Sequence, residues 1–144
     1  MKYARLSETT YILRLERGEL IHETIQSFCR EHQVSNASLC GIGSIENPRL
    51  AHYAVEGKQF TERALVGIYE ITSLLGNVGL LDQQPMSHLH ITVSDALMRA
   101  YGGHLVTGAS SATLEIFLQD LQTSYTKRFD DAVGLNVWDF NAAP

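Results

Sequence analysis

The sequence has few cysteines and no long apolar run. Its 144 residues include only two cysteines, Cys29 and Cys40, which are too far apart to form a CxxC pair. Disulfide frameworks and cysteine-rich zinc sites therefore have little support, and we expect both thiols to be buried. No apolar stretch approaches the roughly 18–20 residues of a membrane span, and the first residues lack the apolar core of a signal peptide. These absences predict a soluble, cytoplasmic protein with no membrane partner.

Positive charge is also scarce. The chain has 11 lysines and arginines against 16 acidic residues, which gives a formal net charge of −5. This is the wrong sign for a protein that must neutralise many DNA phosphates, although it leaves room for a small basic patch. With 44% hydrophobic residues, a chain of this length can bury one substantial core but is short for two. We therefore expect a single domain over residues 1–144.

Two different hydrophobic periods near the start indicate a strand followed by a helix. Residues 10–17 alternate along the chain as a half-buried strand does, and Gly18 then supplies a turn. From Glu19 to about His32 apolar residues recur at helical spacing, with polar residues on the other face. We expect this amphipathic helix to leave His22 and His32 at the surface.

The rest of the chain has the pattern of short β-strands. Segments 37–65, 67–81 and 86–95 are rich in β-branched and apolar residues and are separated by glycine, proline and the polar turn DQQP. Residues 112–121 alternate again and predict a further strand, while residues 135–144 could be a short edge strand or a docked tail. One early helix and many strands, without βαβ alternation, predict an α+β fold with a mainly antiparallel sheet and the helix packed on it.

Three histidines have the spacing of a metal site. His88 and His90 flank one leucine in SHLHITVSD, and His104 follows in AYGGHL. Residues two apart on a strand point to the same face about 6.6–6.8 Å apart, so both imidazoles can reach one ion at a zinc–nitrogen distance of roughly 2.0–2.1 Å. If residues 95–99 form a five-residue hairpin loop, His90 pairs with His104 and all three rings share one face. A slip of one residue would turn His104 away.

Two interpretations of this trio stay open. The rings could be outward polar side chains of a half-exposed strand, bonded to water or to neighbours. They could equally hold one divalent metal with an open coordination position, as in catalytic zinc sites. Zinc is the leading candidate, although neutral imidazole also suits copper, nickel, iron and cobalt. His52 lies between apolar residues, which favours a sheet histidine over a fourth ligand.

Other polar residues have less defined roles. Glu115 could orient a ligand or act as a general base if its strand adjoins the histidines. Glu70 could be buried and paired, exposed, or near the metal. Asn77 could satisfy backbone groups at a strand end or face a ligand. Arg63 and Arg99 could anchor an anion, but either is more typical of a solvated surface charge.

The order of motifs resembles the plant and prokaryote conserved domain, the PPC domain. TYILRLERGE, SLCGIGSIENPRL, YEITSLLGNV, SHLHITVSD, AYGGHL and ATLEIFL follow the family's order and cover nearly the whole chain. The resemblance implies an α+β domain with a largely antiparallel sheet, assembled as a homotrimer. It also implies that His88, His90 and His104 match positions that hold a zinc-like ion in some prokaryotic members. A similar HxH pair with a later histidine occurs in acetolactate decarboxylase, a distant likeness that suggests chemistry on a small oxoacid.

Two functions from different classes follow. The first is a metal-binding homotrimer that acts on or senses a small carboxylated or carbonyl metabolite. The second is a noncatalytic trimeric module for regulation or interaction, with weak DNA contact. Plant PPC proteins carry Arg-Gly-Arg-Pro segments before this domain. These 144 residues contain none, and the nearest basic cluster is Lys127 and Arg128. We therefore expect no specific DNA binding by this chain, and leave open whether it is an enzyme.

Overall fold

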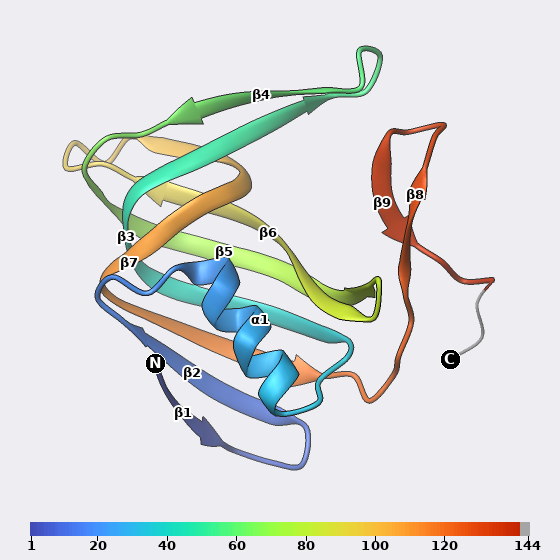
Figure 1. Cartoon of the computed structure of the whole chain (residues 1–144). Helices are drawn as coiled ribbons and strands as arrows, with labels where there is room; N and C mark the ends of the chain where they lie inside the picture. Colours follow the sequence, from blue (N-terminus) through green and yellow to red (C-terminus); the bar gives the residue numbers. More distant parts are fainter. Residues whose placement is uncertain (142–144) are drawn as a thin grey trace.

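A seven-stranded sheet and one helix make up most of the molecule (Figure 1). The structure is a computed structural model that describes residues 1–141. All strand pairings in the sheet are antiparallel, which confirms the predicted α+β fold with an early helix. In chain order the elements are β1 (Lys2–Arg5), β2 (Thr10–Glu16), α1 (Ile21–Glu31), β3 (Ala37–Ala54), β4 (Gln59–Ala64), β5 (Ile68–Leu81), β6 (Gln84–Ser94), β7 (Ala100–Asp120), β8 (Lys127–Asp130) and β9 (Leu135–Trp138).

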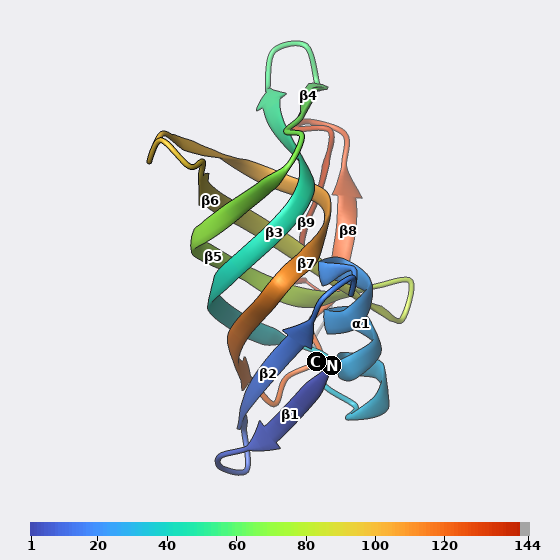
Figure 2. The ribbon, with the colours of Figure 1, turned by 90° about the vertical axis from the view of Figure 1, so that its left-hand side faces the viewer.

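The four long strands close into a barrel. The sheet order is β1-β2-β7-β6-β5-β3-β4, and β7 also pairs with β3. Strands β3, β5, β6 and β7 therefore form a ring in which each pairs with the next, and β3 and β7 lie side by side in Figure 2. This closure pairs backbone N–H and C=O groups that would otherwise stay unpaired at an open sheet edge.

The close approach of β3 to β7 depends on a glycine. A Cβ atom at Gly41 would lie 2.6 Å from the carbonyl oxygen of Glu115 on β7. The register of β3 against β5 shifts between Gly41 and Gly43, as a bulge does. Both glycines therefore serve close packing of β3 against β7 inside a long strand.

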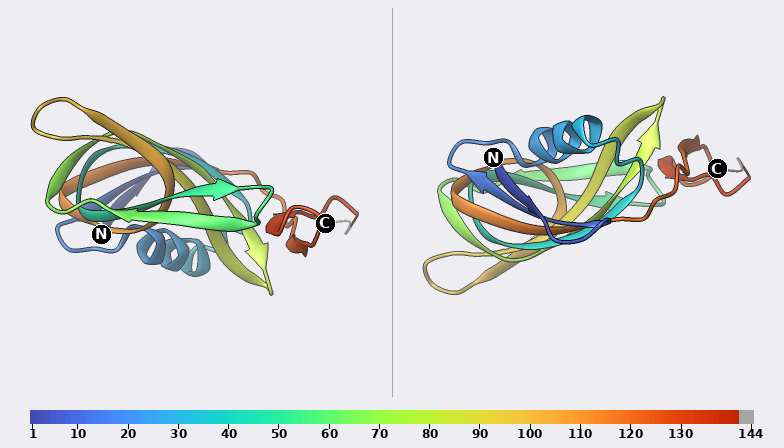
Figure 3. Two further views of the ribbon diagram at one scale, coloured as in Figure 1. Left: turned by 90° about the horizontal axis from the view of Figure 1, so that it is seen from above. Right: turned by 90° about the horizontal axis from the view of Figure 1, so that it is seen from below.

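Helix α1 lies along one side of the strands (Figure 3). The helix packs on a core built from β2, β3, β5, β6 and β7. Its own buried residues are Ile21, Ile25, Phe28 and Cys29. Burial raises the pKa of the Cys29 thiol to about 12, so this cysteine is inert at neutral pH. The helix has 11 residues, too few to cross a bilayer, and no other helix occurs within residues 1–141.

Three sequence expectations about exposure are wrong. Cys40 is exposed, because β3 alternates and Leu39 is the residue that points into the core. His22 is partly buried, since it flanks the apolar face of α1 and reaches acceptors on the strands beneath. His32 is also partly buried, with its ring centroid 4.3 Å from that of Phe28.

Strands β8 and β9 form a separate hairpin that stands at one end of the barrel (Figures 1 and 3). Tyr53 on β3 donates a hydrogen bond to the Val133 carbonyl oxygen at 2.6 Å. Lys127 donates to Asn77 Oδ1 on β5 at 2.8 Å and lies over the Trp138 ring, 4.8 Å from its centroid. The predicted edge strand or tail at 135–144 is thus half of a hairpin, and its last residues, 142–144, lie outside the described residues.

Candidate metal centre

The hairpin of β6 and β7 has the register that the sequence predicted. Residues Asp95–Arg99 connect the strands, and His90 pairs with His104. The carboxylate of Asp95 organises this loop, because it accepts hydrogen bonds from the backbone N–H groups of Leu97 and Arg99 at 2.9 and 3.0 Å. It also pairs with the Arg99 guanidinium at 2.7 Å. A five-residue loop with a fixed polar centre excludes the one-residue slip that would separate the histidines.

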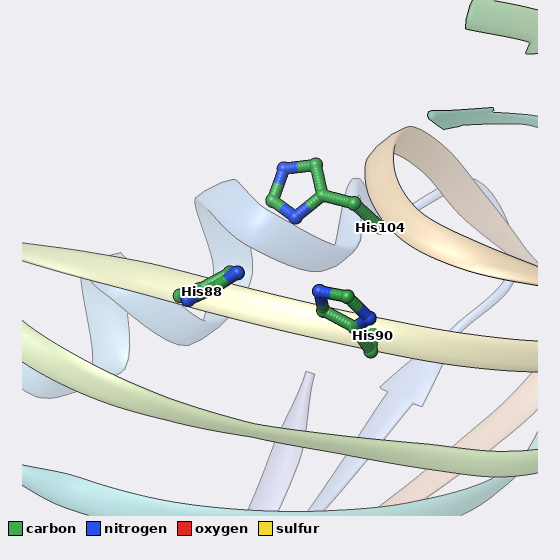
Figure 4. Close-up of side chains that lie close together, drawn as sticks. All are labelled: His88, His90 and His104. Atoms are coloured by element: carbon green, nitrogen blue, oxygen red, sulfur yellow. The ribbon is translucent and has the colours of Figure 1, made fainter. Parts of the chain in front are cut away.

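The three imidazoles point toward one another (Figure 4). Ring centroids lie 5.3 Å apart for His88–His90, 5.1 Å for His88–His104 and 5.6 Å for His90–His104. One nitrogen from each ring lies within 4.8 Å of the others. A tetrahedral zinc shell needs ligand nitrogens roughly 3.4 Å apart. Because His88 and His90 are exposed, their rings are free to rotate by the small amount that this requires.

The surroundings of His88 and His104 favour their neutral forms. Partial burial lowers the pKa of His104 to about 4, and the neighbouring His88 and His90 add to the effect. The pKa of His88 is lowered by partial burial and then by the charges of Lys127 and His90. Neutral imidazole is the form that binds a metal ion. Both residues are therefore ready to act as ligands at neutral pH.

A further histidine, His22, holds the two ligand strands together from the helix side. His22 on α1 contacts Ser87 Oγ at 2.7 Å through Nδ1 and the Leu105 carbonyl oxygen at 2.8 Å through Nε2. Because a carbonyl oxygen only accepts, Nε2 carries the proton and Nδ1 accepts from Ser87. Ser87 precedes His88 and Leu105 follows His104, so one ring ties both ligand strands to the helix. Sequence analysis missed this role, and only its place beside the apolar face of α1 hinted at burial.

The histidines open into a cavity of about 810 Å³. Its walls come from β3, β4, β6, β7 and the β8–β9 hairpin. Among the described residues that line it there is no aspartate, glutamate, lysine or arginine, and the apolar members are Ala51, Val55, Phe60, Met86, Phe129 and Leu135. This size falls within the range of small-molecule pockets. His52 also lines the cavity but is not one of the three clustered histidines.

The acidic candidates lie elsewhere. Glu115 is exposed on β7, opposite Arg14 of β2 and Ile42 of β3. That part of β7 pairs with β2 and β3 and not with β6, so Glu115 lies away from the histidines although it shares β7 with His104. Glu70 is exposed opposite Ser94 at the far end of β5. Neither carboxylate is among the residues that line the cavity.

Two of the three remaining polar candidates, Asn77 and Arg99, have side-chain partners. Asn77 sits directly opposite His88 and accepts a hydrogen bond from Lys127, so it binds a side chain and not the backbone groups of a strand end. Arg99 is exposed and paired with Asp95, and Arg63 is exposed on β4. Neither arginine is among the cavity residues, which agrees with their reading as surface charges.

Comparison with known proteins identifies similar sequences and folds. The chain is 33% identical to a plant- and prokaryote-conserved (PPC) protein of Pyrococcus horikoshii, with a TM-score of 0.85 over 96% of this chain and 93% of that one. It is 29% identical to a metal-containing protein of Archaeoglobus fulgidus, with a TM-score of 0.84 over 94% and 99%. A Bacteroides thetaiotaomicron protein to which DNA binding has been ascribed is 26% identical, with a TM-score of 0.92 over 97% of both chains.

The likeness to acetolactate decarboxylase is confined to the fold. A Staphylococcus aureus protein described as similar to that enzyme is 12% identical, with a TM-score of 0.54 over 82% of this chain and 55% of that one. No curated protein sequence matches the chain significantly.

A family model covers the whole barrel and all three clustered histidines. The model of the Plants and Prokaryotes Conserved (PCC) domain, the family called PPC above, matches residues 3–122. The matched range ends before the β8–β9 hairpin, which begins at Lys127. The chain therefore belongs to the PCC domain family.

Proposed function

We propose that this chain is a metal-binding protein in which His88, His90 and His104 hold one divalent ion, with zinc the leading candidate. The observation that carries the proposal is the convergence of three imidazoles from two paired strands, with one nitrogen of each within 4.8 Å of the others. Three histidines with a fourth position for water or a ligand is a common donor set for zinc. The metal-containing relative from Archaeoglobus fulgidus supports the proposal.

The residues around the histidines favour binding of a small molecule over a complete catalytic apparatus. A bound metal would supply Lewis acidity at the open position, and the cavity beside it would hold a carboxylated or carbonyl metabolite. Within residues 1–141, no carboxylate lines the cavity that could act as a general base. Sensing or sequestering a metabolite therefore fits the site better than proton-transfer catalysis does.

The outer face of the barrel supports assembly of several chains. Leu75, Cys40 and Phe117 are direct cross-strand neighbours on β5, β3 and β7, and all three are exposed, Leu75 by 57% and Phe117 by 51%. Ile42, two residues along β3 from Cys40, is 61% exposed. A row of exposed apolar side chains across three strands is typical of an interface. We propose that it forms part of the contact in a homotrimer.

Metal analysis tests the central proposal. The protein should be purified without a histidine tag, stripped with EDTA, reloaded separately with Zn²⁺, Co²⁺, Ni²⁺ or Mn²⁺, and analysed for bound metal. We expect one ion per chain, with zinc bound more tightly than manganese because imidazole is a poor match for the harder ion. The Co²⁺ form should show the absorption of a four-coordinate shell. A metal content far below one ion per chain with all four metals would contradict the proposal.

The second candidate is a regulatory or interaction module with weak DNA contact. It rests on the Bacteroides thetaiotaomicron relative to which DNA binding has been ascribed. The net charge of −5 opposes it, because phosphate neutralisation supplies most nonspecific affinity. A gel-shift titration at physiological salt decides between weak, salt-sensitive binding and a true DNA-binding function.

A further inference from the structure

The cavity beside the histidines combines imidazoles with apolar walls. His88, His90 and His104 line it from β6 and β7. The apolar walls come from two separate hairpins: β3–β4 with Phe60, whose ring centroid lies 5.7 Å from that of His104, and β8–β9 with Phe129. Both phenylalanines are well exposed, Phe60 by 46% and Phe129 by 56%. Two exposed aromatic rings that face one cavity offer an apolar surface for a ligand to cover.

The β8–β9 hairpin is held at both ends, so its apolar wall is preorganised. Near the turn, Tyr53 donates to the Val133 carbonyl oxygen at 2.6 Å, and Lys58 Nζ contacts the Asp131 carbonyl oxygen. At the base, Lys127 is bonded to Asn77 and covered by the Trp138 ring. A wall that is already in place costs a ligand little ordering entropy on binding. This wall begins after residue 122, outside the part of the chain that the family model matches.

The charges around the histidines favour an anion. Lys127 is only 6% exposed, and its hydrogen-bond partner is the neutral amide of Asn77. Asn77 sits opposite His88, which places this ammonium group next to the proposed metal position. Within residues 1–141 no carboxylate lies at ion-pair distance from Lys127, and none lines the cavity. A divalent ion and a buried ammonium group together leave positive charge that a bound anion would balance.

We propose that the cavity binds a small carboxylic acid with an apolar body of one or two rings. The carboxylate takes the open position on the metal, and the rings pack against Phe60, Phe129 and Leu135. The β8–β9 hairpin then determines, together with Phe60 of β4, which acid is bound. This inference rests on the proposed metal site and adds to it the class of ligand.

Calorimetry with simple probes tests the ligand class. Zinc-loaded protein should be titrated with acetate, benzoate, 2-naphthoate and benzamide. Benzoate should bind at least about tenfold more tightly than acetate, because its ring buries roughly 100 Å² more apolar surface. 2-Naphthoate should bind at least as tightly as benzoate. Benzamide has the same ring without the negative charge and should bind at least about tenfold more weakly than benzoate.

A matched pair of variants tests whether the apolar wall contributes to benzoate affinity. Phe129→Ala removes an exposed ring of the cavity wall, and Leu97→Ala removes an apolar side chain that is 71% exposed in the β6–β7 loop, outside the cavity. Phe129→Ala should weaken benzoate binding about tenfold while leaving acetate binding and metal content unchanged. Leu97→Ala should change none of the three. Circular dichroism confirms that each variant is folded, and Phe129→Leu should restore part of the lost affinity.

The outcomes separate this inference from the metal site beneath it. If zinc binds to the histidines but benzoate binds no more tightly than acetate, or benzamide matches benzoate, the ligand class is wrong and the metal proposal stands. Unchanged benzoate affinity in Phe129→Ala would show that the β8–β9 hairpin does not contact the ring of the ligand. A protein that takes up no metal overturns both proposals.

Discussion

Substituting His90→Ala should abolish the stabilisation of the protein by metal and leave the metal-free protein almost unchanged. His90 is the ligand that links the two strands, since it shares β6 with His88 and pairs with His104 on β7. Its side chain is exposed, so its loss creates no cavity in the core. Exposed substitutions of this kind usually change stability by less than about 0.5 kcal/mol. The effect of the variant should therefore appear only when metal is present.

The size of the metal effect follows from linkage. At a free metal concentration 100 times the dissociation constant, binding to the folded state adds about 2.7 kcal/mol of stability. For a chain of 144 residues this corresponds to a rise in Tm of about 8 °C, at roughly 3 °C per kcal/mol. Removing a direct ligand should weaken metal binding at least about 100-fold. Even the loss of a residue that only hydrogen-bonds to a metal ligand lowers metal affinity about 10–100-fold. The same metal concentration would then add only about 0.4 kcal/mol, or about 1 °C.

Thermal unfolding with and without Zn²⁺, at one protein concentration, measures both quantities. His52→Ala is the matched control, because His52 lines the same cavity but is not one of the three clustered histidines. It should keep the full rise in Tm. A rise of about 8 °C that survives in His90→Ala, or disappears in His52→Ala, would refute the assignment of the ligands.

Three further predictions follow. Phe117→Glu places a charge in the exposed apolar row and should convert a trimer to monomers in light scattering, while a monomer before substitution would contradict the proposed assembly. The free energy of unfolding of the metal-free protein should fall by about 1–2 kcal/mol between pH 6.5 and 4. This value is smaller than the full pKa shift of His104 implies, because the ring is partly exposed to solvent. The free energy falls because the pKa of folded His104 is lowered to about 4, whereas the unfolded chain takes up this proton near pH 6.5. Chemical unfolding of His104→Ala should show a smaller loss. DNA binding should be weak and should weaken further as salt is raised, and sequence-selective nanomolar binding at physiological salt would contradict this prediction.

The positions of the three histidines could be predicted because they depend on local rules. The two-residue period of a strand places His88 and His90 on one face, and the length of the β6–β7 loop brings His104 opposite His90. The pattern of the loop is also local, since Asp95 bonds to residues two and four positions further along. The early helix and the mainly antiparallel sheet likewise follow from hydrophobic periods that are visible in short windows.

Features that depend on distant contacts could not be predicted. The exposure of Cys40 is set by which residues of β3 face the core, and a glycine-rich stretch with a bulge blurs that alternation. The partners of His22 lie 65 and 83 residues away, so its hydrogen bonds have no signature in the sequence. Glu115 shares a strand with His104, but a strand of 21 residues is long enough for its two ends to have different neighbours.

The division between the family-matched range and the hairpin after it has a functional consequence. The three clustered histidines lie within residues 3–122, and so does the His22 contact that braces them. Phe129 and Leu135, which supply part of the apolar wall, lie after that range, as does Lys127, which supplies positive charge beside His88. Because ligand selectivity depends on the groups that surround an open metal position as well as on the metal ligands, similarity over residues 3–122 carries information on metal binding. It carries less on ligand selectivity, because in our proposal Phe129 and Leu135 of the β8–β9 hairpin contact the bound acid together with Phe60.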